Sequence, residues 1–324
     1  MEMRRMLGQK LVFGFHGKTL PEEFKNLLRE YKIGNVILFL RNVESAEQLR
    51  ALCAEIQSLV QEETGYPAFI IIDQEGGMVT RLPQDAVNVP GAMSLAATAD
   101  PENARLASEI TIRQLRGLGA NFNMARVLDV NSNPANPVIG VRSFGDEAEC
   151  VASLGCAAIA PYAGSGVLCC AKHFPGHGDT AEDSHTALAV TYKTLDELQA
   201  CELLPFAEDT GLHAVMVGHI AAPNVTGDGT PATLSPQLVA LIPDAENTLI
   251  VTDSLAMDAI TAAYTPGEAA VKALQAGCDV LLMPNSLPEA YAAVLEAVQN
   301  GTISEERLDR SVNKILLYKQ QFAS

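Results

Sequence analysis

The amino-acid sequence predicts an α/β protein built as a closed (β/α)8 barrel. Short apolar, β-branched runs recur eight times along the 324 residues, and longer segments with helical periodicity separate them. No linker rich in Pro, Gly or Ser interrupts this alternation. Because runs that are apolar on both faces and alternate with helices are typical of a buried parallel sheet, eight such units favour a barrel. We therefore expect a single domain over residues 1–324.

The expected strands follow one another along the whole chain. They cover Lys10–Phe15, Asn35–Leu40, Ala68–Asp73, Asn121–Met124, Val167–Ala171, Ala214–Gly218, Thr248–Asp253 and Asp279–Met283. Helices are expected over Ala46–Glu62, Pro101–Leu118, Glu147–Ala163, Gly267–Ala276, Leu287–Gln299 and Ser304–Gln320. The alternative is a doubly wound open sheet. That fold usually has a glycine-rich phosphate turn after its first strand, whereas Phe15-His16-Gly17-Lys18 follows the first run here.

The composition is that of a globular protein with an acidic surface. Apolar residues make up 48% of the chain and charged residues 19%, and 22 Lys and Arg against 39 Asp and Glu give a formal net charge of −17. Nucleic acids and anionic membranes need a basic patch, so neither is expected as a partner. With no recognisable signal peptide and no membrane-length apolar run, we expect a cytoplasmic monomer or weak homo-oligomer. The seven Cys are interpreted as buried reduced thiols.

Polar or ionisable side chains follow five of the eight apolar runs. They are Asp73, Asn123 leading on to Asp129 and Asn131, Lys172 with His173, His219, and Asp253. The C-terminal ends of barrel strands meet at one mouth, where barrel enzymes have their active sites. A single Asp or Asn at such a position is often only a helix cap or a turn residue. Five positions together are harder to explain as caps, and we predict a functional site at this mouth.

The segment 172–185 contains the densest group of chemically active side chains. It includes three of the six His, three acids and one Lys. Its proline and glycines oppose the start of a helix, so we predict a long loop over the mouth. In extended chain, Asp183 and His185 point the same way, and the carboxylate can then orient the imidazole. We interpret these two residues as an acid/base pair.

Other chemistries stay open for this loop. A metal site could use His173, His177, Asp179 and His185, although no HExxH or paired-Cys spacing supports it. A Ser184 nucleophile with His185 as its base lacks the surrounding G-x-S-x-G turn. A loop with only a structural role is the third alternative.

Asp253 is expected to emerge from the barrel interior into the mouth. A carboxylate there can act as nucleophile, general base or metal ligand, or can merely cap the segment that follows. The groups expected to bind a ligand around it are Asp73, Arg81, Arg142, Lys172, His173 and His219. Carboxylates and cations around a pocket suit a hydroxyl-rich ligand, because one carboxylate accepts two hydroxyl protons. We expect a small carbohydrate, without a cofactor or metal ion.

Several of these motifs together resemble glycoside hydrolase family 3, and in particular its β-N-acetylhexosaminidases. The resemblance covers nearly the whole chain. It rests on Lys172–Gly178 with Asp183-Ser184-His185, Ile72–Gly77, Gly140–Phe144, Thr252–Leu255 and Gly34–Asn42, in the family's order. The resemblance implies a single catalytic TIM-like barrel and a retaining double displacement. It also implies that Asp253 is the nucleophile, that His185 with Asp183 is the general acid/base, and that the six groups named above lie around the sugar.

The resemblance implies an exo-β-N-acetylglucosaminidase acting on cell-wall muropeptides or chitin-derived oligosaccharides. A β-glucosidase, a β-xylosidase, an N-acetylglucosaminide phosphorylase and a non-catalytic sugar-binding barrel are the alternatives. The chain departs from the family at Met78, where many relatives carry a basic residue, and at Ser254, where a second Asp often follows the nucleophile. The second departure bears on the hydrogen bonds that position Asp253. Since the chain ends near the last expected helix, we expect one domain to provide all sugar contacts.

Overall fold

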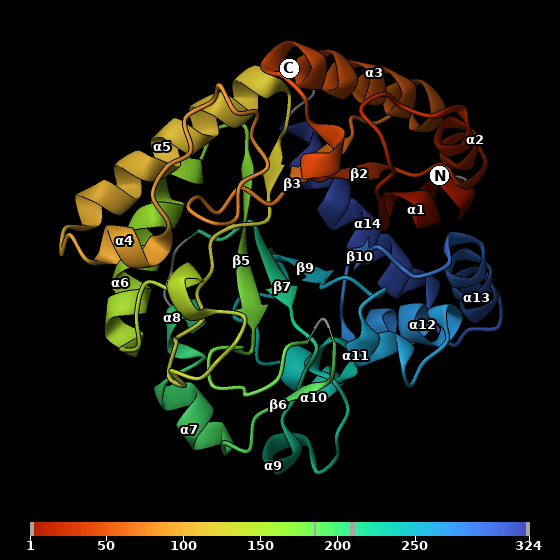
Figure 1. Ribbon diagram of the computed structural model, residues 1–324. Helices are drawn as coiled ribbons and strands as arrows, with labels where there is room; N and C mark the ends of the chain where they lie inside the picture. The colour runs from red at the N-terminus through yellow and green to blue at the C-terminus, as the bar shows by residue number, and fades with distance from the viewer. Residues whose placement is uncertain (1–2, 185, 208–210, 322–324) are drawn as a thin grey trace.

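The expected barrel is present in the computed structural model, which describes residues 3–184, 186–207 and 211–321. Eight parallel strands form one sheet in the order β10-β1-β2-β3-β4-β5-β7-β9, surrounded by helices (Figure 1). The strands are β1 (Leu11–Phe13), β2 (Asn35–Leu38), β3 (Phe69–Ile72), β4 (Phe122–Asn123), β5 (Leu168–Phe174), β7 (Ala214–Val217), β9 (Leu249–Thr252) and β10 (Leu281–Leu282). A parallel bridge between Val251 and Val280 joins β9 to the chain just before β10 and closes the ring. All eight strand predictions are confirmed.

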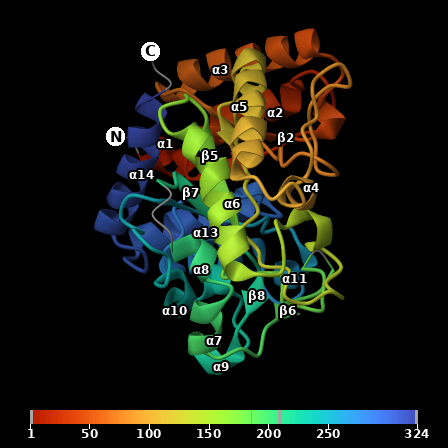
Figure 2. The same cartoon turned by 90° about the vertical axis from the view of Figure 1, so that its left-hand side faces the viewer.

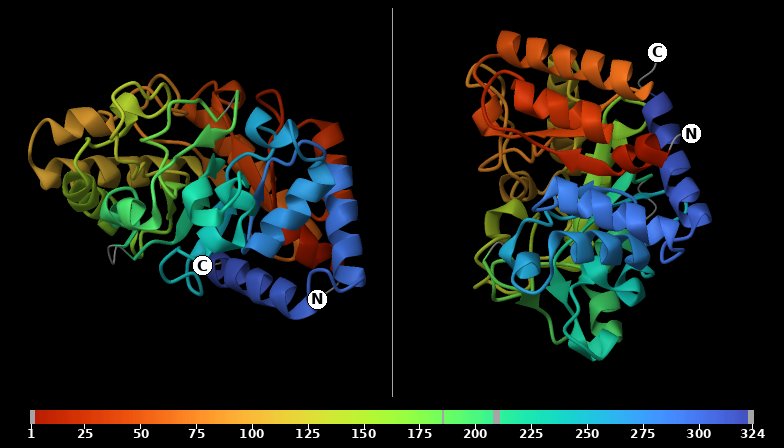
Figure 3. Two further views of the ribbon diagram at one scale, coloured as in Figure 1. Left: turned by 90° about the horizontal axis from the view of Figure 1, so that it is seen from below. Right: turned by 90° about the vertical axis from the view of Figure 1, so that its right-hand side faces the viewer.

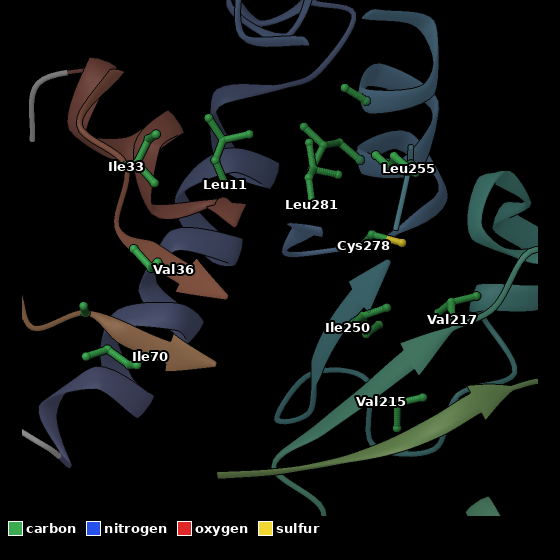
Figure 4. Packing of buried hydrophobic residues seen from close by; sticks show 14 of the residues in the cluster. Leu11, Ile33, Val36, Ile70, Val215, Val217, Ile250, Leu255, Cys278 and Leu281 are labelled. Atoms are coloured by element: carbon green, nitrogen blue, oxygen red, sulfur yellow. The ribbon is translucent and has the colours of Figure 1, made fainter. Parts of the chain in front are cut away.

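The strands are apolar on both faces because each face packs against a different core. Leu249 and Val251 of β9 belong to a cluster with contributions from all eight strands, which fills the barrel interior. Ile250, between them, belongs to the larger cluster between sheet and helices. Figure 4 shows part of that outer layer, including Val215 of β7 and Cys278 before β10. This alternation decides which residues at the strand ends continue into the mouth.

Helices cover the outside of the sheet (Figures 1 and 2). The longer ones are α2 (Glu22–Tyr31), α3 (Ala46–Thr64), α5 (Pro101–Leu118), α6 (Ala148–Ile159), α12 (Pro266–Ala276), α13 (Leu287–Gln299) and α14 (Glu305–Gln320). The six predicted helices are confirmed to within a few residues, except that residues 160–162 of the third one form a 3-10 turn. Side-chain oxygens of Ser45, Asp100 and Ser304 accept backbone N–H groups at the starts of α3, α5 and α14.

Short elements complete the description. The short helices are α1 (Met3–Gln9), α4 (Ala92–Ala96), α7 (Leu195–Ala200), α8 (Leu204–Ala207), α9 (Pro223–Thr226), α10 (Pro236–Val239) and α11 (Asp258–Thr261). The 3-10 turns are η1 (Leu40–Asn42), η2 (Gly140–Arg142), η3 (Ala160–Tyr162) and η4 (Ala232–Leu234). Outside the barrel, β6 (Ala189–Val190) pairs in parallel with β8 (Ile220–Ala221). This small ribbon joins the loop after β5 to the chain after β7.

The N-terminal end of the barrel is closed by α14. Ile315 of this helix belongs to the interior cluster, and α14 lies beside α1 (Figure 3). Lys319 of the same helix is fully buried and donates to Gln9 Oε1 at 2.6 Å and to the Gly34 carbonyl at 2.8 Å. This end is therefore filled by side chains and leaves the opposite end as the place for a site.

Two expectations about the chain as a whole have mixed outcomes. Cys53, Cys169, Cys170 and Cys278 are buried, but Cys150 on α6 is exposed, so the prediction of buried thiols is wrong for that residue. Its position on the outer face of the helix is the reason. Within the described residues, we find no helix with both the length and the apolar character needed to cross a membrane. The cytoplasmic location and the oligomeric state stay predictions.

Candidate active site

Asp253 lies at the C-terminal end of β9, in phase with Val251, which belongs to the interior cluster. The backbone N–H of Ser254 donates to its Oδ1 at 2.7 Å. Burial raises the pKa of this carboxyl, but the nearby His219 and His173 and the Ser254 N–H lower it by more, and the pKa lies below the usual range for Asp. Asp253 is thus a half-buried carboxylate that stays ionised at neutral pH.

A compact group of two carboxylates and two cations lies beside it, on β5 and the loops after β3 and β4. Lys172 Nζ lies 3.0 Å from Asp73 Oδ1 and 2.8 Å from Glu75 Oε1. Arg142 binds Glu75 with two parallel hydrogen bonds, from Nε at 2.9 Å and from Nη2 at 2.8 Å. Burial raises the pKa of Glu75, but Lys172 and Arg142 lower it by more, to well below its usual range. The net pKa shifts of Lys172 and Arg142 are upward, so Glu75, Lys172 and Arg142 stay charged at neutral pH.

His173 is oriented by a buried carboxylate. Asp129 Oδ2 accepts from His173 Nδ1 at 2.7 Å, and the backbone N–H of His173 lies 3.2 Å from both oxygens of Asp129. The backbone N–H of His177 donates to the other oxygen of Asp129 at 2.6 Å. Burial raises the pKa of Asp129, but the two His lower it by more, and the net shift is downward. One ionised carboxylate thus positions both His residues at the end of β5.

His219 is fully buried, and both ring nitrogens have partners. Its Nδ1 lies 2.8 Å from Thr233 Oγ1, and its Nε2 lies 2.9 Å from the Ser254 carbonyl oxygen. Since a carbonyl only accepts, Nε2 carries a proton. His219 thus contacts the backbone next to Asp253, and its predicted contact with the ligand stays a prediction.

Three further residues predicted for the site are Arg81, Asp183 and His185. The backbone N–H of Arg81 donates to Gln74 Oε1 at 2.8 Å, and its guanidinium reaches the Thr80 carbonyl at 3.3 Å, so no described bond joins it to the charged group. Asp183 is half-buried on the loop after β5. His185 lies outside the described residues. Their proposed pairing stays a prediction.

Sequence reasoning missed two important groups. Glu75 lies in the motif Ile72–Gly77 without a predicted role, and Asp129 is predicted only as a polar residue beyond β4. The signal for Glu75 is its position two residues after Asp73, because a second acid at a strand end needs a cation. Its partner Arg142 is 67 residues away along the chain, and no local pattern identifies that pairing.

The structure shows the surroundings of Ser254 and Met78, the two positions at which the sequence departs from the family pattern. Ser254 reaches Asp253 through its backbone N–H, so this contact does not depend on the side chain. Met78 is 79% exposed, and it lines a cavity of about 280 Å³ beside Glu75 and Arg142. The walls of that cavity are mostly apolar and come from the loops after β3 and β4 and from α4, α5 and η2.

Both alternative chemistries of the loop after β5, the metal site and the Ser184 nucleophile, involve His185 and stay untested. Ser184 is only 2% exposed, and its Oγ lies 2.9 Å from His177 Nε2. The partner of this hydroxyl among the described residues is therefore His177, whereas the Ser184 alternative uses His185 as the base. Both ring nitrogens of His177 contact hydroxyl groups. Across the part of the chain that the structure describes, no three His, Cys, Asp or Glu side chains come close enough to share a metal ion.

Comparison with known proteins gives consistent matches along the whole chain. Residues 4–317 match the family described as Glycosyl hydrolase family 3 N terminal domain. Beta-hexosaminidase A of Pseudoalteromonas piscicida is 36% identical over an alignment that covers 97% of this chain and 60% of that protein. The beta-hexosaminidase of Alkalilimnicola ehrlichii is 34% identical, with 94% of this chain and 89% of that protein covered.

Solved structures agree with the sequence matches. The glycoside hydrolase family 3 beta-N-acetylglucosaminidase from Paenibacillus sp. str. FPU-7 has a TM-score of 0.96 and 43% identity, with 100% of this chain and 63% of that chain covered. The beta-N-acetylhexosaminidase from Beutenbergia cavernae has a TM-score of 0.89 and 28% identity, with 99% of both chains covered. The chain thus spans 60% and 63% of the length of two of these four relatives.

Proposed function

We propose that this chain, which belongs to glycoside hydrolase family 3, is a retaining exo-β-N-acetylglucosaminidase. The observation that carries the proposal is Asp253, a carboxylate kept ionised at the mouth of the barrel beside groups suited to sugar hydroxyls. A retaining enzyme needs such a carboxylate close to the anomeric carbon, and a separate acid near the leaving oxygen. The names of the relatives support N-acetylhexosamine as the sugar.

In the proposed first step, a carboxylate oxygen of Asp253 bonds to the anomeric carbon as the bond to the leaving oxygen breaks. His185, oriented by Asp183, gives its proton to that oxygen. In the second step, His185 takes a proton from water, the water oxygen bonds to the anomeric carbon, and Asp253 leaves as a carboxylate. The lowered pKa of Asp253 supports this role because the nucleophile needs no deprotonation at neutral pH.

The charged group on β5 and the loops after β3 and β4 is proposed to bind the sugar hydroxyls. Lys172 donates to Asp73 and Glu75, which fixes both carboxylates and leaves Asp73 with an oxygen that can accept hydroxyl protons. His173, oriented by Asp129, and Arg142 are proposed as further contacts, with Arg81 at the edge of the site. Lys172 is 4% exposed, and we propose that it forms the wall against which the terminal sugar ends, so that only terminal residues are removed.

For the natural substrate we propose muropeptides or chitooligosaccharides with a terminal N-acetylglucosamine. The acceptor is proposed to be water. Phosphate is the competing acceptor, because a His acid adds less negative charge to the site than a Glu acid.

Turnover of 4-nitrophenyl N-acetyl-β-D-glucosaminide tests the proposal, with the matching β-glucoside as control and with phosphate present or absent. We expect free N-acetylglucosamine from the first substrate only, with the β-anomer formed first in a proton NMR time course. A sugar 1-phosphate as product would make the enzyme a phosphorylase. Turnover of the glucoside alone would contradict the sugar specificity, and no turnover of either would favour a non-catalytic sugar-binding barrel.

A further inference from the structure

In the loop after β5, residues 175–188, the buried side chain of His177 forms hydrogen bonds that have no part in the proposed mechanism. The ring of His177 lies inside the loop and is 1% exposed. Its Nδ1 lies 2.8 Å from Thr180 Oγ1, and its Nε2 lies 2.9 Å from Ser184 Oγ. The ring therefore bridges an early and a late residue of the loop.

The position of His177 is set by the barrel and not by the loop. Its backbone N–H donates at 2.6 Å to Asp129, the fully buried carboxylate that also orients His173. Gly178, next in sequence, lies so close to the backbone of Val130 that a Cβ would be 1.8 Å from the Val130 carbonyl oxygen. The chain at 177–178 is thus packed directly onto the segment after β4.

Ser184 is buried, although the three residues before it are exposed or half-buried. Ala181 and Glu182 are exposed and Asp183 is half-buried, whereas Ser184 is 2% exposed and reaches His177 with its hydroxyl. In sequence, Ser184 lies directly between Asp183 and His185. Any rotation of the chain at Ser184 would turn the half-buried Asp183 that precedes it.

We propose that His177 and Ser184 are positioning residues, which fix the chain at 184 and thereby place the acid/base pair on either side of it. This inference rests on the proposed function. Two hydrogen bonds of His177 connect Asp129 with Ser184. The His177 backbone N–H donates to Asp129, and the His177 ring nitrogen Nε2 contacts the Ser184 hydroxyl. Burial and the nearby His173 lower the pKa of His177, so its ring is neutral near pH 7 and remains a hydrogen-bonding group rather than a charge.

The ends of the loop are joined independently of this contact. Asp179 Oδ2 accepts from Thr191 Oγ1 at 2.9 Å, and Lys193 Nζ lies 3.5 Å from Asp179 Oδ1 and also contacts Glu202. Removing the Ser184 hydroxyl therefore leaves the loop attached at both ends. We expect Ser184→Ala to fold normally.

The experiment compares wild type with Ser184→Ala on aryl N-acetyl-β-D-glucosaminides whose leaving groups range from 4-nitrophenol to 4-methoxyphenol. Protonation matters most for the poor leaving group, and a general acid contributes about 10²- to 10⁴-fold. A misplaced acid retains part of that effect. We expect kcat/KM to fall roughly 10-fold or more on the 4-methoxyphenyl substrate and less than about 3-fold on the 4-nitrophenyl substrate.

Two controls separate positioning from general damage. Ser304→Ala removes a helix-cap hydrogen bond on α14, at the other end of the barrel, and we expect equal, small effects on both substrates. Ser184→Thr keeps the hydroxyl, and we expect it to retain the wild-type dependence on leaving group. Hydrogen–deuterium exchange of Ser184→Ala is expected to accelerate in residues 180–190 and to stay unchanged elsewhere.

The possible outcomes are distinct. An equal loss on all leaving groups in Ser184→Ala, or no loss, overturns the positioning role while the proposed function stands. Unchanged exchange in residues 180–190 also overturns it. If wild type hydrolyses none of the glycosides, the proposed function fails and the catalytic part of this inference fails with it, while the exchange data still decide whether Ser184 fixes the loop.

Discussion

The two ends of the barrel each bury a group of charged side chains, and the two groups differ in charge balance. At the mouth, the carboxylates of Asp73 and Glu75 lie with the cations Lys172 and Arg142. At the opposite end, within the part of the chain that the structure describes, the carboxylate of Asp279 lies among three basic side chains. Lys314 Nζ lies 2.7 Å from it, Arg307 Nη1 lies 3.3 Å from it, and Lys10 contacts Ser311, which donates to it.

The two groups contain a buried lysine each, and the pKa values of these two lysines shift in opposite directions. In the balanced group, burial lowers the pKa of Lys172, but Asp73 and Glu75 raise it by more, so the net shift is upward. In the unbalanced group, burial lowers the pKa of Lys10 to about 7, although Asp279 opposes that shift. Burial therefore lowers the pKa of Lys10 by more than Asp279 raises it, and Arg307 and Lys314 lower it further, whereas two carboxylates outweigh burial at Lys172. Glu75 and Lys172 at the mouth are therefore charged at neutral pH, whereas the other end of the barrel is covered by α14.

The largest expected effect concerns Asp253, a mouth carboxylate with no ion pair to the cations of the charged group among the described contacts. Asp253→Asn keeps the size of the side chain but removes the nucleophilic oxygen charge. We expect kcat to fall by roughly 10³-fold or more, with little change in the free energy of unfolding. Steady-state kinetics and urea unfolding measure the two quantities. Retention of a tenth of the wild-type kcat would exclude Asp253 as the nucleophile.

The same substitution at both ends tests the charge balance directly. Lys172→Met leaves Asp73 and Glu75 with one cation fewer, and breaking a buried ion pair costs about 3–5 kcal/mol. Lys10→Met removes a side chain that is only partly charged at pH 7, and we expect a change of less than about 1 kcal/mol. Urea unfolding at pH 7 compares them. Equal losses in both variants would contradict the role given to charge balance.

The pH dependence of stability tests whether burial lowers the pKa of Lys10. The pKa of Lys10 is about 7 in the folded chain and about 10.4 when unfolded, so the unfolded chain binds more protons between these values. The free energy of unfolding therefore rises with pH between these two values. The contribution of Lys10 to stability is fully present above about pH 10.4 and is lost as the pH falls to 7. We expect wild type to gain roughly 3 kcal/mol relative to Lys10→Met between pH 7 and 9.5. A constant difference across this range would show that Lys10 is charged.

The smallest expected effect concerns the side chain next to Asp253. Since Ser254 donates to Asp253 through its backbone N–H, the hydroxyl is dispensable for that contact. We expect Ser254→Ala to retain kcat/KM within about 2-fold. A loss beyond 10-fold, measured on the 4-nitrophenyl substrate, would show that the hydroxyl itself contacts the substrate or the nucleophile.

The barrel could be predicted because its determinants are local. Residues 249–252 are apolar on both faces, and this pattern predicts a buried strand wherever the chain places it. Asp253 follows that strand directly, so its position at the mouth is a consequence of the fold class. The exposure of Cys150 was not predictable in the same way, because it depends on which face of α6 packs inward.

The sequence by itself determined the eight strands, the helices between them and the candidate residues at the strand ends, because periodicity and strand-end position are properties of neighbouring residues. Only the tertiary structure decided the partners of those residues. It joined Glu75 to Arg142 and Lys172, buried His219 beneath Ser254, and set His177 against Ser184. Pairings between distant segments depend on distances of a few ångströms, and these exist only once the barrel has closed.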